Sequence, residues 1–346
     1  MEPRLAERTL SLNYKINQMI KKLISLIAYY KFGVVTVIFR ELLFQAAKRT
    51  PFIQFLRTSV YDFEMFIPVK NDGIGRQLFV LRGRESDHKW MMDREVHRGN
   101  VILDIGANIG YYALMEAKRL QGSGKIHAIE PDPRNIRFLE KNISSSGLQN
   151  LIDVREGAIS NFDGQLDFAL ADSTNLSSFN TLTAPASKII KVTVYEFGAY
   201  VERIGKIDLV RMDVEGHEVE ILCSLAELLK RNIDLAPKKI IFETHRYGAN
   251  QEKMAGILQA LFDYGYTVKY ISSDDELSAK GSVFSQFGYS PFKILEEWRV
   301  SRGLYRNISS QDAIELISRR RGTRTVCLEF SPAGQAIDAL AHNTTE

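Results

Sequence analysis

The sequence predicts an α/β protein with a mostly parallel, doubly wound, Rossmann-like sheet and a helical extension at its N-terminus. From residue 101 onward, short apolar runs alternate with amphipathic segments, which is the pattern of parallel strands joined by helices. Of the 346 residues, 45% are apolar and 25% are charged, which is globular composition. Charge separates the extension from the rest: ten Lys or Arg against three Glu give residues 1–60 a charge of +7. The whole chain carries +3, so −4 remains for residues 61–346.

The extension is predicted over residues 1–59 as a basic amphipathic helical segment. Residues 12–30 place apolar side chains at helical spacing, and residues 33–47 are apolar but interrupted by Arg40. This run falls short of the roughly 20 apolar residues that a membrane-spanning helix needs. We therefore expect helices packed on the main domain of a cytoplasmic protein. The less favoured alternative is peripheral contact of residues 12–47 with an anionic membrane.

Two further segments flank the predicted core. Residues 60–100 are expected to lead into it as a hairpin that turns at Asn71-Asp72-Gly73, followed by a helix over residues 87–97. Residues 273–346 break the strand–helix rhythm and are expected to form a variable C-terminal segment. Within it, residues 325–330 are apolar enough for a last strand, added antiparallel to the sheet.

The core is predicted over residues 101–272. The expected strands are 101–105, 125–129, 152–156, 207–212, 239–243 and 267–271. The expected helices are 111–120, 133–145, 218–229 and 252–264. The two cysteines, Cys223 and Cys327, have no metal-ligand spacing, which excludes a zinc ribbon and a disulfide scaffold and favours a reducing compartment.

The most informative stretch is the loop that follows the first core strand. Asp104 ends the strand, Gly106 permits a tight turn, and Gly110 lets the next helix approach the sheet. Asn108 stands where a dinucleotide-binding loop has its second glycine, and no third glycine follows, so a nicotinamide cofactor is disfavoured. Asp104 would suit an ammonium group better than a pyrophosphate.

A second acid completes the cofactor pattern. Glu130 lies 20 residues beyond Gly110, where a carboxylate can accept both hydroxyls of a ribose. An ammonium at Asp104 and a ribose at Glu130 describe S-adenosylmethionine, so the pattern predicts a class I methyltransferase. The candidate cofactor-binding residues are Asp104, Gly106, Asn108, Gly110, Glu130, Pro131, Asp132, Gly157 and Ala158.

Over residues 65–275 the sequence resembles the FkbM family of methyltransferases. The resemblance is carried by the blocks 104–112 (DIGANIGYY), 129–133 (IEPDP), 207–218 (IDLVRMDVEGHE) and 240–243 (IIFE), with weaker matches at 156–160 and 175–179. The sequence departs from the family where Arg211 replaces a usual Lys and where Tyr195-Glu196 replaces a usual Leu-Asp. The resemblance implies O-methylation of a hydroxyl on a small molecule or glycan: a sugar, a glycan or glycolipid, or a secondary metabolite.

Methyl transfer to an alcohol needs a positioned base, because the acceptor loses its proton as the new bond forms. The ends of the fourth and fifth strands offer five candidate catalytic residues: Asp213, Glu215, His217, Glu243 and His245. His245 or His217 is the leading base, with Asp213 and Glu243 orienting it or the hydroxyl. A metal-free site is favoured over Mg²⁺ held by Asp213, Glu243 and His245. A polar loop offers candidate acceptor contacts: Asn175, Ser177 and Ser178.

Two other classes of function remain as alternatives. In a nucleic-acid methyltransferase, the basic extension and Arg319–Arg321 would contact phosphates. Against it, the fourth strand ends in Asp213-Val-Glu-Gly216 instead of the motif of base-amino methyltransferases, and no RNA-binding module is recognisable. A non-catalytic scaffold is the second alternative, and the intact cofactor pattern argues against it. The sequence does not predict an oligomeric state.

Overall fold

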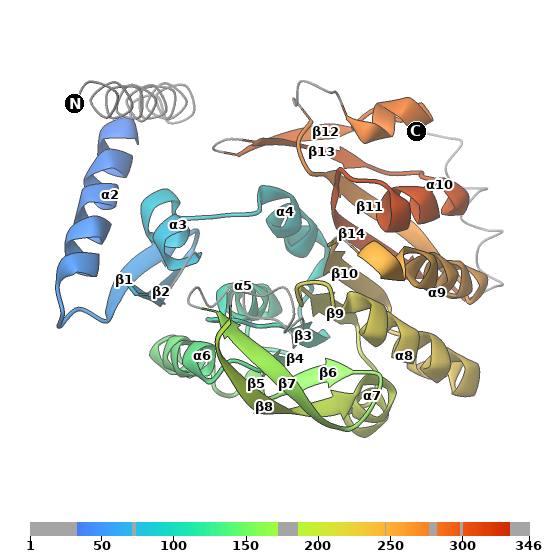
Figure 1. Ribbon diagram of the computed structural model, residues 1–346, viewed down its shortest axis with the longest axis horizontal. Helices are drawn as coiled ribbons and strands as arrows, with labels where there is room; N and C mark the ends of the chain where they lie inside the picture. The colour runs from blue at the N-terminus through green and yellow to red at the C-terminus, as the bar shows by residue number, and fades with distance from the viewer. Residues whose placement is uncertain are drawn as a thin grey trace, which may run out of the picture.

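A computed structural model describes residues 33–70, 74–171, 186–245, 247–276, 282–297 and 300–332. These residues form a central mixed sheet with the strand order β12-β13-β11-β14-β10-β9-β3-β4-β5 (Figure 1). Two smaller sheets accompany it, β1-β2 and β6-β8-β7. The predicted α/β fold with a mostly parallel, doubly wound sheet is confirmed.

The centre of the main sheet is parallel. It consists of β3 (Val101–Ile105), β4 (Lys125–Glu130), β5 (Ile152–Glu156), β9 (Leu209–Met212) and β10 (Lys239–Glu243). Each of these strands agrees with its predicted range to within two residues. The chain runs from β3 outward through β4 and β5, and later returns to the other side of β3 with β9 and β10. This reversal of strand order makes the carboxyl end of β3 a switch point, where ligands bind in such sheets.

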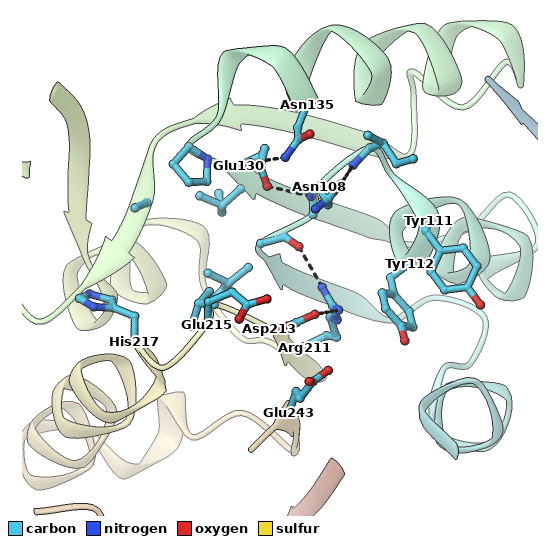
Figure 2. Close-up of a pocket in the computed structure, with 18 of the residues that line it drawn as sticks. Asn108, Tyr111, Tyr112, Glu130, Asn135, Arg211, Asp213, Glu215, His217 and Glu243 are labelled. Carbon is cyan, nitrogen blue, oxygen red and sulfur yellow. Dashed lines mark hydrogen bonds and ion pairs between the residues drawn. The ribbon is translucent and has the colours of Figure 1, made fainter. Parts of the chain in front are cut away.

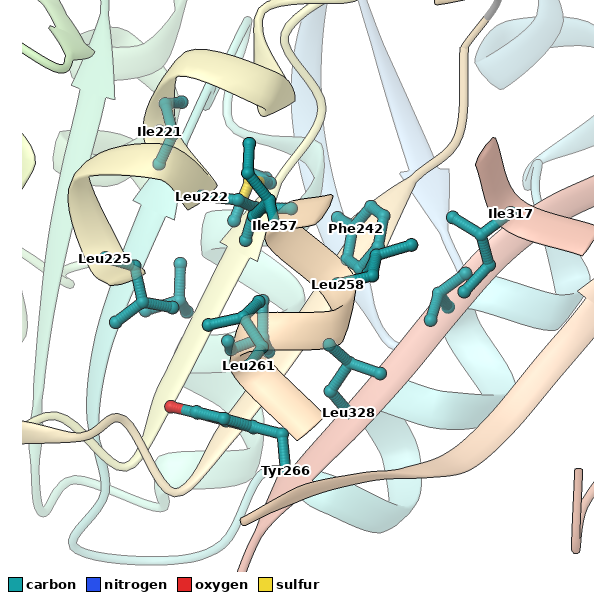
Figure 3. Packing of buried hydrophobic residues seen from close by; sticks show 14 of the residues in the cluster. Ile221, Leu222, Leu225, Phe242, Ile257, Leu258, Leu261, Tyr266, Ile317 and Leu328 are labelled. Carbon is teal, nitrogen blue, oxygen red and sulfur yellow. The ribbon is translucent and has the colours of Figure 1, made fainter. Parts of the chain in front are cut away.

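Helices cover both faces of the sheet. One apolar cluster contains residues of α7 (Phe197–Ile204), α8 (Glu218–Arg231) and α9 (Gln251–Asp263), and Figure 3 shows Leu258 of α9 near Phe242 and Leu328. The other cluster contains residues of α4 (Ser86–Glu95), α5 (Tyr111–Leu120) and α6 (Pro133–Ser145). Sequence signals explain the helix starts: Asp132 caps α6 by accepting a hydrogen bond from the Arg134 amide at 2.9 Å, and Pro133 fills the first turn.

The C-terminal part completes the same sheet. β14 (Thr323–Phe330) lies between β10 and β11 (Tyr266–Ser273) and is antiparallel to both, as predicted for the last strand. β12 (Lys293–Glu297) and β13 (Val300–Tyr305) extend the edge beyond β11. The sequence patterns missed these two strands and a set of short helices: η3 (Ile233–Leu235), η4 (Gly248–Asn250), η5 (Val283–Phe287), α10 (Ser310–Ile314) and η6 (Glu315–Arg319).

The N-terminal part contains α2 (Val34–Arg49), β1 (Phe55–Val60), β2 (Phe63–Pro68) and α3 (Ile74–Leu81). The predicted hairpin exists, but its predicted turn was wrong. The chain turns at Tyr61 and Asp62, where Tyr61 has a left-handed φ of 50°. The segment after residue 73 is a helix, because Ile74 and Leu78 bury the same helical face. The helix predicted over residues 12–30 lies outside the described residues.

The second small sheet lies beside the main sheet (Figure 1). Its strands are β6 (Ala158–Ser160), β7 (Gly164–Ala171) and β8 (Ala186–Glu196), with β8 paired to both of the others. The sequence patterns did not predict this sheet. The candidate acceptor contacts Asn175, Ser177 and Ser178 fall between β7 and β8, outside the described residues.

Candidate functional site

A cavity of about 310 Å³ opens at the carboxyl ends of β3, β4, β9 and β10 (Figure 2). It therefore lies at the switch point of the sheet. Its apolar lining includes Ile105, Ile109, Ile129, Ile159, Phe168 and Val214. Its polar lining includes Arg84, Glu85, Asn108, Glu130, Asn135, Arg211, Asp213, Glu215, His217, Glu243, His245 and Arg324.

The loop after β3 is fixed against the end of β9. Gly106 has a φ of +80°, and a Cβ at this position would lie 2.3 Å from the carbonyl oxygen of Asp213. Only glycine fits, both because of its backbone conformation and because of this close approach. The backbone amides of Gly106 and Ala107 donate to the carbonyl oxygen of Ile129 at 2.9 and 3.0 Å. The loop is thus held between two strands at the edge of the cavity.

Glu130 forms the polar floor of one end of the cavity. Its Oε2 accepts a hydrogen bond from the Asn108 amide at 2.8 Å, and its Oε1 accepts from the Asp132 amide at 2.9 Å and from Asn135 Nδ2 at 3.1 Å. Burial raises the pKa of Glu130 to about 7, although these hydrogen bonds act in the opposite direction. The carboxylate is therefore pre-oriented at the wall of the cavity.

Asp104 lies behind Arg211 instead of lining the cavity. Its side chain is fully buried, and burial raises its pKa despite the neighbouring guanidinium. Arg211 Nη1 donates to Asp104 Oδ1 at 3.1 Å and to the Gly106 carbonyl at 3.0 Å, while Nη2 donates to Asp213 at 3.3 Å. The predicted cofactor residues thus separate into two groups. Lining the cavity are Gly106, Asn108, Glu130, Pro131, Gly157 and Ala158; outside its lining are Asp104, Gly110 and Asp132.

His245 is surrounded by carboxylates. Its Nδ1 lies 3.0 Å from Oε1 of the fully buried Glu218. Its Nε2 faces oxygens of Glu215 at 3.5 Å, Glu243 at 3.7 Å and Asp213 at 3.9 Å. Burial alone would lower the pKa of His245, but Glu218 and the other carboxylates outweigh it and raise this pKa to about 10. The imidazole is therefore a cation at neutral pH.

The acids around His245 differ from one another. Burial and the nearby Asp213 raise the pKa of Glu215 to about 7, and its side chain is 41% exposed. Glu215 also has a left-handed φ of 53°, which is uncommon for a residue other than glycine. Burial, followed by Asp213 and Glu85, raises the pKa of Glu243 well above its usual range. A carboxylate that titrates near neutrality and is open to water is suited to accept and release a proton.

His217 belongs to a different part of the cavity wall. Its Nε2 lies 2.9 Å from Ser160 Oγ on β6, and burial lowers its pKa. Figure 2 shows it apart from Arg211 and Glu243. The structure therefore brings together Asp213, Glu215, Glu243 and His245, but not His217.

Sequence reasoning missed a set of charged residues at the opposite wall. Arg324 on β14 forms ion pairs with Glu243 and, at 3.2 Å, with Glu85. Glu85 also pairs with Arg84 and accepts a 2.5 Å hydrogen bond from the hydroxyl of Tyr112. Because these residues come from distant parts of the chain, no local motif joins them. Of these residues, Tyr112 alone belongs to one of the sequence motifs, the DIGANIGYY block, so it was the one sign in the sequence that this part of the cavity wall exists.

The donor geometry also bears on metal binding. Among the described residues, one group of three His, Cys, Asp or Glu side chains has ligand atoms within 4.8 Å of one another: Asp213, Glu243 and His245. Oxygen and imidazole nitrogen donors of this kind suit several divalent ions. Two of these three side chains already hold positive charge in place of a metal: Glu243 forms an ion pair with Arg324, and His245 carries a proton.

Comparisons with known proteins relate the chain to methyltransferases. Residues 104–268 match the model of the methyltransferase FkbM domain. Hexuronic acid methyltransferase AglP of Haloferax volcanii is 26% identical over 150 residues, 43% of this chain and 59% of its own length. A ribosomal protein L11 methyltransferase of Chloroflexus aurantiacus is 32% identical over 69 residues, 20% of each chain. The chain thus spans less than two thirds of the length of either curated relative.

Solved structures of methyltransferases are also among the proteins to which the chain is similar. A methyltransferase FkbM from Methylobacillus flagellatus has a TM-score of 0.34 and 16% identity, over 49% of this chain and 40% of its own. A putative tRNA (m1A22) methyltransferase of Streptococcus pneumoniae, in complex with S-adenosyl-L-methionine, has a TM-score of 0.34 and 13% identity, over 72% and 74%.

Proposed function

We propose that this chain, whose residues 104–268 match the methyltransferase FkbM domain, transfers a methyl group from S-adenosylmethionine to a hydroxyl of a sugar-containing acceptor. The observation that carries the proposal is the buried, pre-oriented Glu130 carboxylate at one end of the cavity, with the Asp213–Glu215–Glu243–His245 cluster at the other. One end suits a ribose, and the other suits an alcohol that must lose a proton.

The residues of the cavity fit the cofactor. Glu130 would accept hydrogen bonds from the two ribose hydroxyls, and Gly157 and Ala158, with Ile129 and Ile159 beside them, would border the adenine. S-adenosylmethionine would supply the methyl group on a cationic sulfur. Asp104 would act on the cofactor through Arg211, since it has no exposed surface of its own.

Proton removal is assigned to Glu215. Its pKa of about 7 leaves a substantial ionised fraction at neutral pH, and its exposure lets the proton pass to water. His245, held as a cation by Glu218, would orient Glu215, Glu243 and Asp213 instead of accepting a proton itself. Transfer is an in-line displacement, so holding the acceptor oxygen in position is the main contribution of the site.

Among the acceptors that the sequence suggests, a sugar hydroxyl has the most support. One relative, 26% identical over 150 residues, is a hexuronic acid methyltransferase by name. A glycan, a glycolipid and a glycosylated secondary metabolite all present such hydroxyls.

Calorimetry with S-adenosylmethionine, on the wild type and Glu130→Ala, tests the cofactor. We expect binding by the wild type and a weakening of about 100-fold or more in the variant, the size of two lost hydrogen bonds to a charged group. No binding by the wild type would favour the scaffold alternative.

Transfer of labelled methyl to glycosylated acceptors, with RNA and DNA in parallel, tests the acceptor. Labelling of nucleic acid alone would overturn the sugar assignment.

A further inference from the structure

Helix α2 has two apolar faces, and the structure accounts for one of them. Val37, Phe44 and Ala47 are buried, with Val37 packed on Val80 of α3 and Phe44 in ring contact with Phe79. This inner face attaches the helix to the body of the protein.

The outer face of α2 is exposed. Val35, Phe39 and Leu42 are 69%, 59% and 64% exposed, and Ile38 and Leu43 beside them are 38% and 43% exposed. Positions 35, 38, 39 and 42 follow the i, i+3, i+4, i+7 spacing of one helical face. Scattered exposed apolar residues are ordinary, but a contiguous row of this length marks an interaction surface. We define these five residues as the outer face of α2.

The surroundings of the outer face identify its partner by charge. Lys48 and Arg49 occupy the last turn of α2, and the acid of the helix, Glu41, pairs with Arg76 at 2.8 Å. Residues 33–60 together carry four Lys or Arg against one Glu, a charge of +3. Just after the helix, Phe52 is 92% exposed. The apolar side chains of the outer face and Phe52 would contact the acyl chains of an anionic bilayer, and Lys48 and Arg49 would contact its negatively charged headgroups.

Other occupants fit less well. A second copy of the chain would bring another segment of +3 against the first, so the two would repel each other. A bilayer of anionic lipid offers both an apolar phase and negative charge.

We propose that the outer face of α2 docks the protein on the surface of an anionic membrane, with the helix in the plane of the interface. Among the described helices, none is both long enough and apolar enough to cross a bilayer. Figure 1 shows α2 at one side of the molecule, away from β9 and β10, so docking would leave the cavity accessible. The proposal does not depend on the identity of the methyl acceptor.

Vesicle sedimentation of the full chain tests this docking. Phosphatidylcholine vesicles with and without phosphatidylserine are compared, at low and at high salt. We expect the chain to sediment with the anionic vesicles, less so at high salt, and the double variant Phe39→Glu/Leu42→Glu to bind about tenfold or more weakly. The matched control is Ile189→Glu/Ile233→Glu, which adds the same two charges at exposed apolar positions elsewhere, 53% and 40% exposed, and should bind like the wild type.

Each other outcome overturns the proposal. Absence of binding, equal binding to neutral vesicles, or equal weakening in both double variants removes the membrane as the partner. A dimer in solution that Phe39→Glu/Leu42→Glu dissociates would assign the face to a second copy. A fall in thermal midpoint in Phe39→Glu/Leu42→Glu alone, without vesicle binding by the wild type, would assign it to residues 1–32 of the same chain.

Discussion

Arg211 donates a 3.1 Å hydrogen bond to the carboxylate of Asp104, and this contact decides what the acid at the end of β3 can do. The two residues lie opposite each other in the parallel pairing of β3 with β9. The guanidinium also reaches Asp213 and stacks 4.0 Å from the ring centre of Tyr112. A lysine, the usual residue of the FkbM family at this position, presents a single point charge and would not span the two carboxylates with the same geometry.

Asp104→Ala should therefore lower stability before it affects chemistry. The substitution leaves Arg211, which is 2% exposed, without its fully buried partner, and breaking such a pair costs about 3 kcal/mol or more of unfolding free energy. Urea denaturation measures the loss. Asp167→Ala is the control, because its ion pair with Lys191 is exposed and should contribute less than about 1 kcal/mol. Equal losses in the two variants would contradict the structural role of Asp104.

Cofactor affinity should depend on the ionisation of Glu130. Its pKa is raised to about 7, so below neutrality the carboxyl holds a proton, and above neutrality the ionised carboxylate can accept from ribose hydroxyls. We expect the dissociation constant of S-adenosylmethionine to fall about tenfold from pH 6 to pH 8 and then level off.

Calorimetry at several pH values measures this dependence, and Glu130→Gln separates it from titration of the cofactor itself. The variant should bind weakly and lack the Glu130 contribution to the pH dependence. Identical pH dependence in the wild type and the variant would exclude Glu130 from the binding step.

The position of the site was predictable because it depends on local signals. Apolar runs and glycines place β3, its loop and α5, and the acid at the end of β4 then has to lie at the same edge of the sheet. The orientation of Asp104 was not predictable. Its strand is covered on both faces, so its apolar neighbours do not indicate which way a polar side chain points.

The second wall of the site depends on contacts that no local pattern encodes. Arg324 meets Glu85 across 239 positions of sequence because β14 inserts antiparallel between β10 and β11. The protonation of His245 has the same origin: it depends on how many carboxylates the fold gathers around one imidazole, which residue spacing alone does not give.

Glu215→Gln should reduce turnover about 10²–10⁴-fold, the usual contribution of a general base. Cofactor affinity should remain unchanged, because Glu215 lies at the other end of the cavity from Glu130. Since only the ionised carboxylate accepts a proton, wild-type turnover should rise as the pH passes about 7, and the variant should lose this limb. Single-turnover kinetics across pH measure both effects. Glu227→Gln, an exposed residue of α8, is the control; if the two variants retain similar turnover, another group is the base.

Glu218→Gln should lower the pKa of His245 from about 10 toward its ordinary value, because it removes the strongest of the charges that hold the proton. The sign of the stability effect follows. The charged imidazole stabilises the fold fully below about pH 6.5, and this stabilisation is lost as the pH rises through about 10. NMR titration of the imidazole measures the pKa directly. An unchanged pKa in Glu218→Gln would show that the other carboxylates suffice.

Turnover should survive removal of divalent metal. Asp213, Glu243 and His245 have the donor spacing of a metal site, but a metal would have to displace the proton from His245 and separate Glu243 from Arg324. Protonated His245 and Arg324 already balance part of the negative charge of Asp213 and Glu243. Dialysis against EDTA, followed by turnover and thermal-midpoint measurements with added Mg²⁺, Mn²⁺ or Zn²⁺, checks the expectation. The expectation is wrong if EDTA stops turnover, one of these ions restores it, and Asp213→Asn abolishes the ion-dependent rise in thermal midpoint. In that case the three side chains hold a metal, and His245 carries a proton only when the metal is absent.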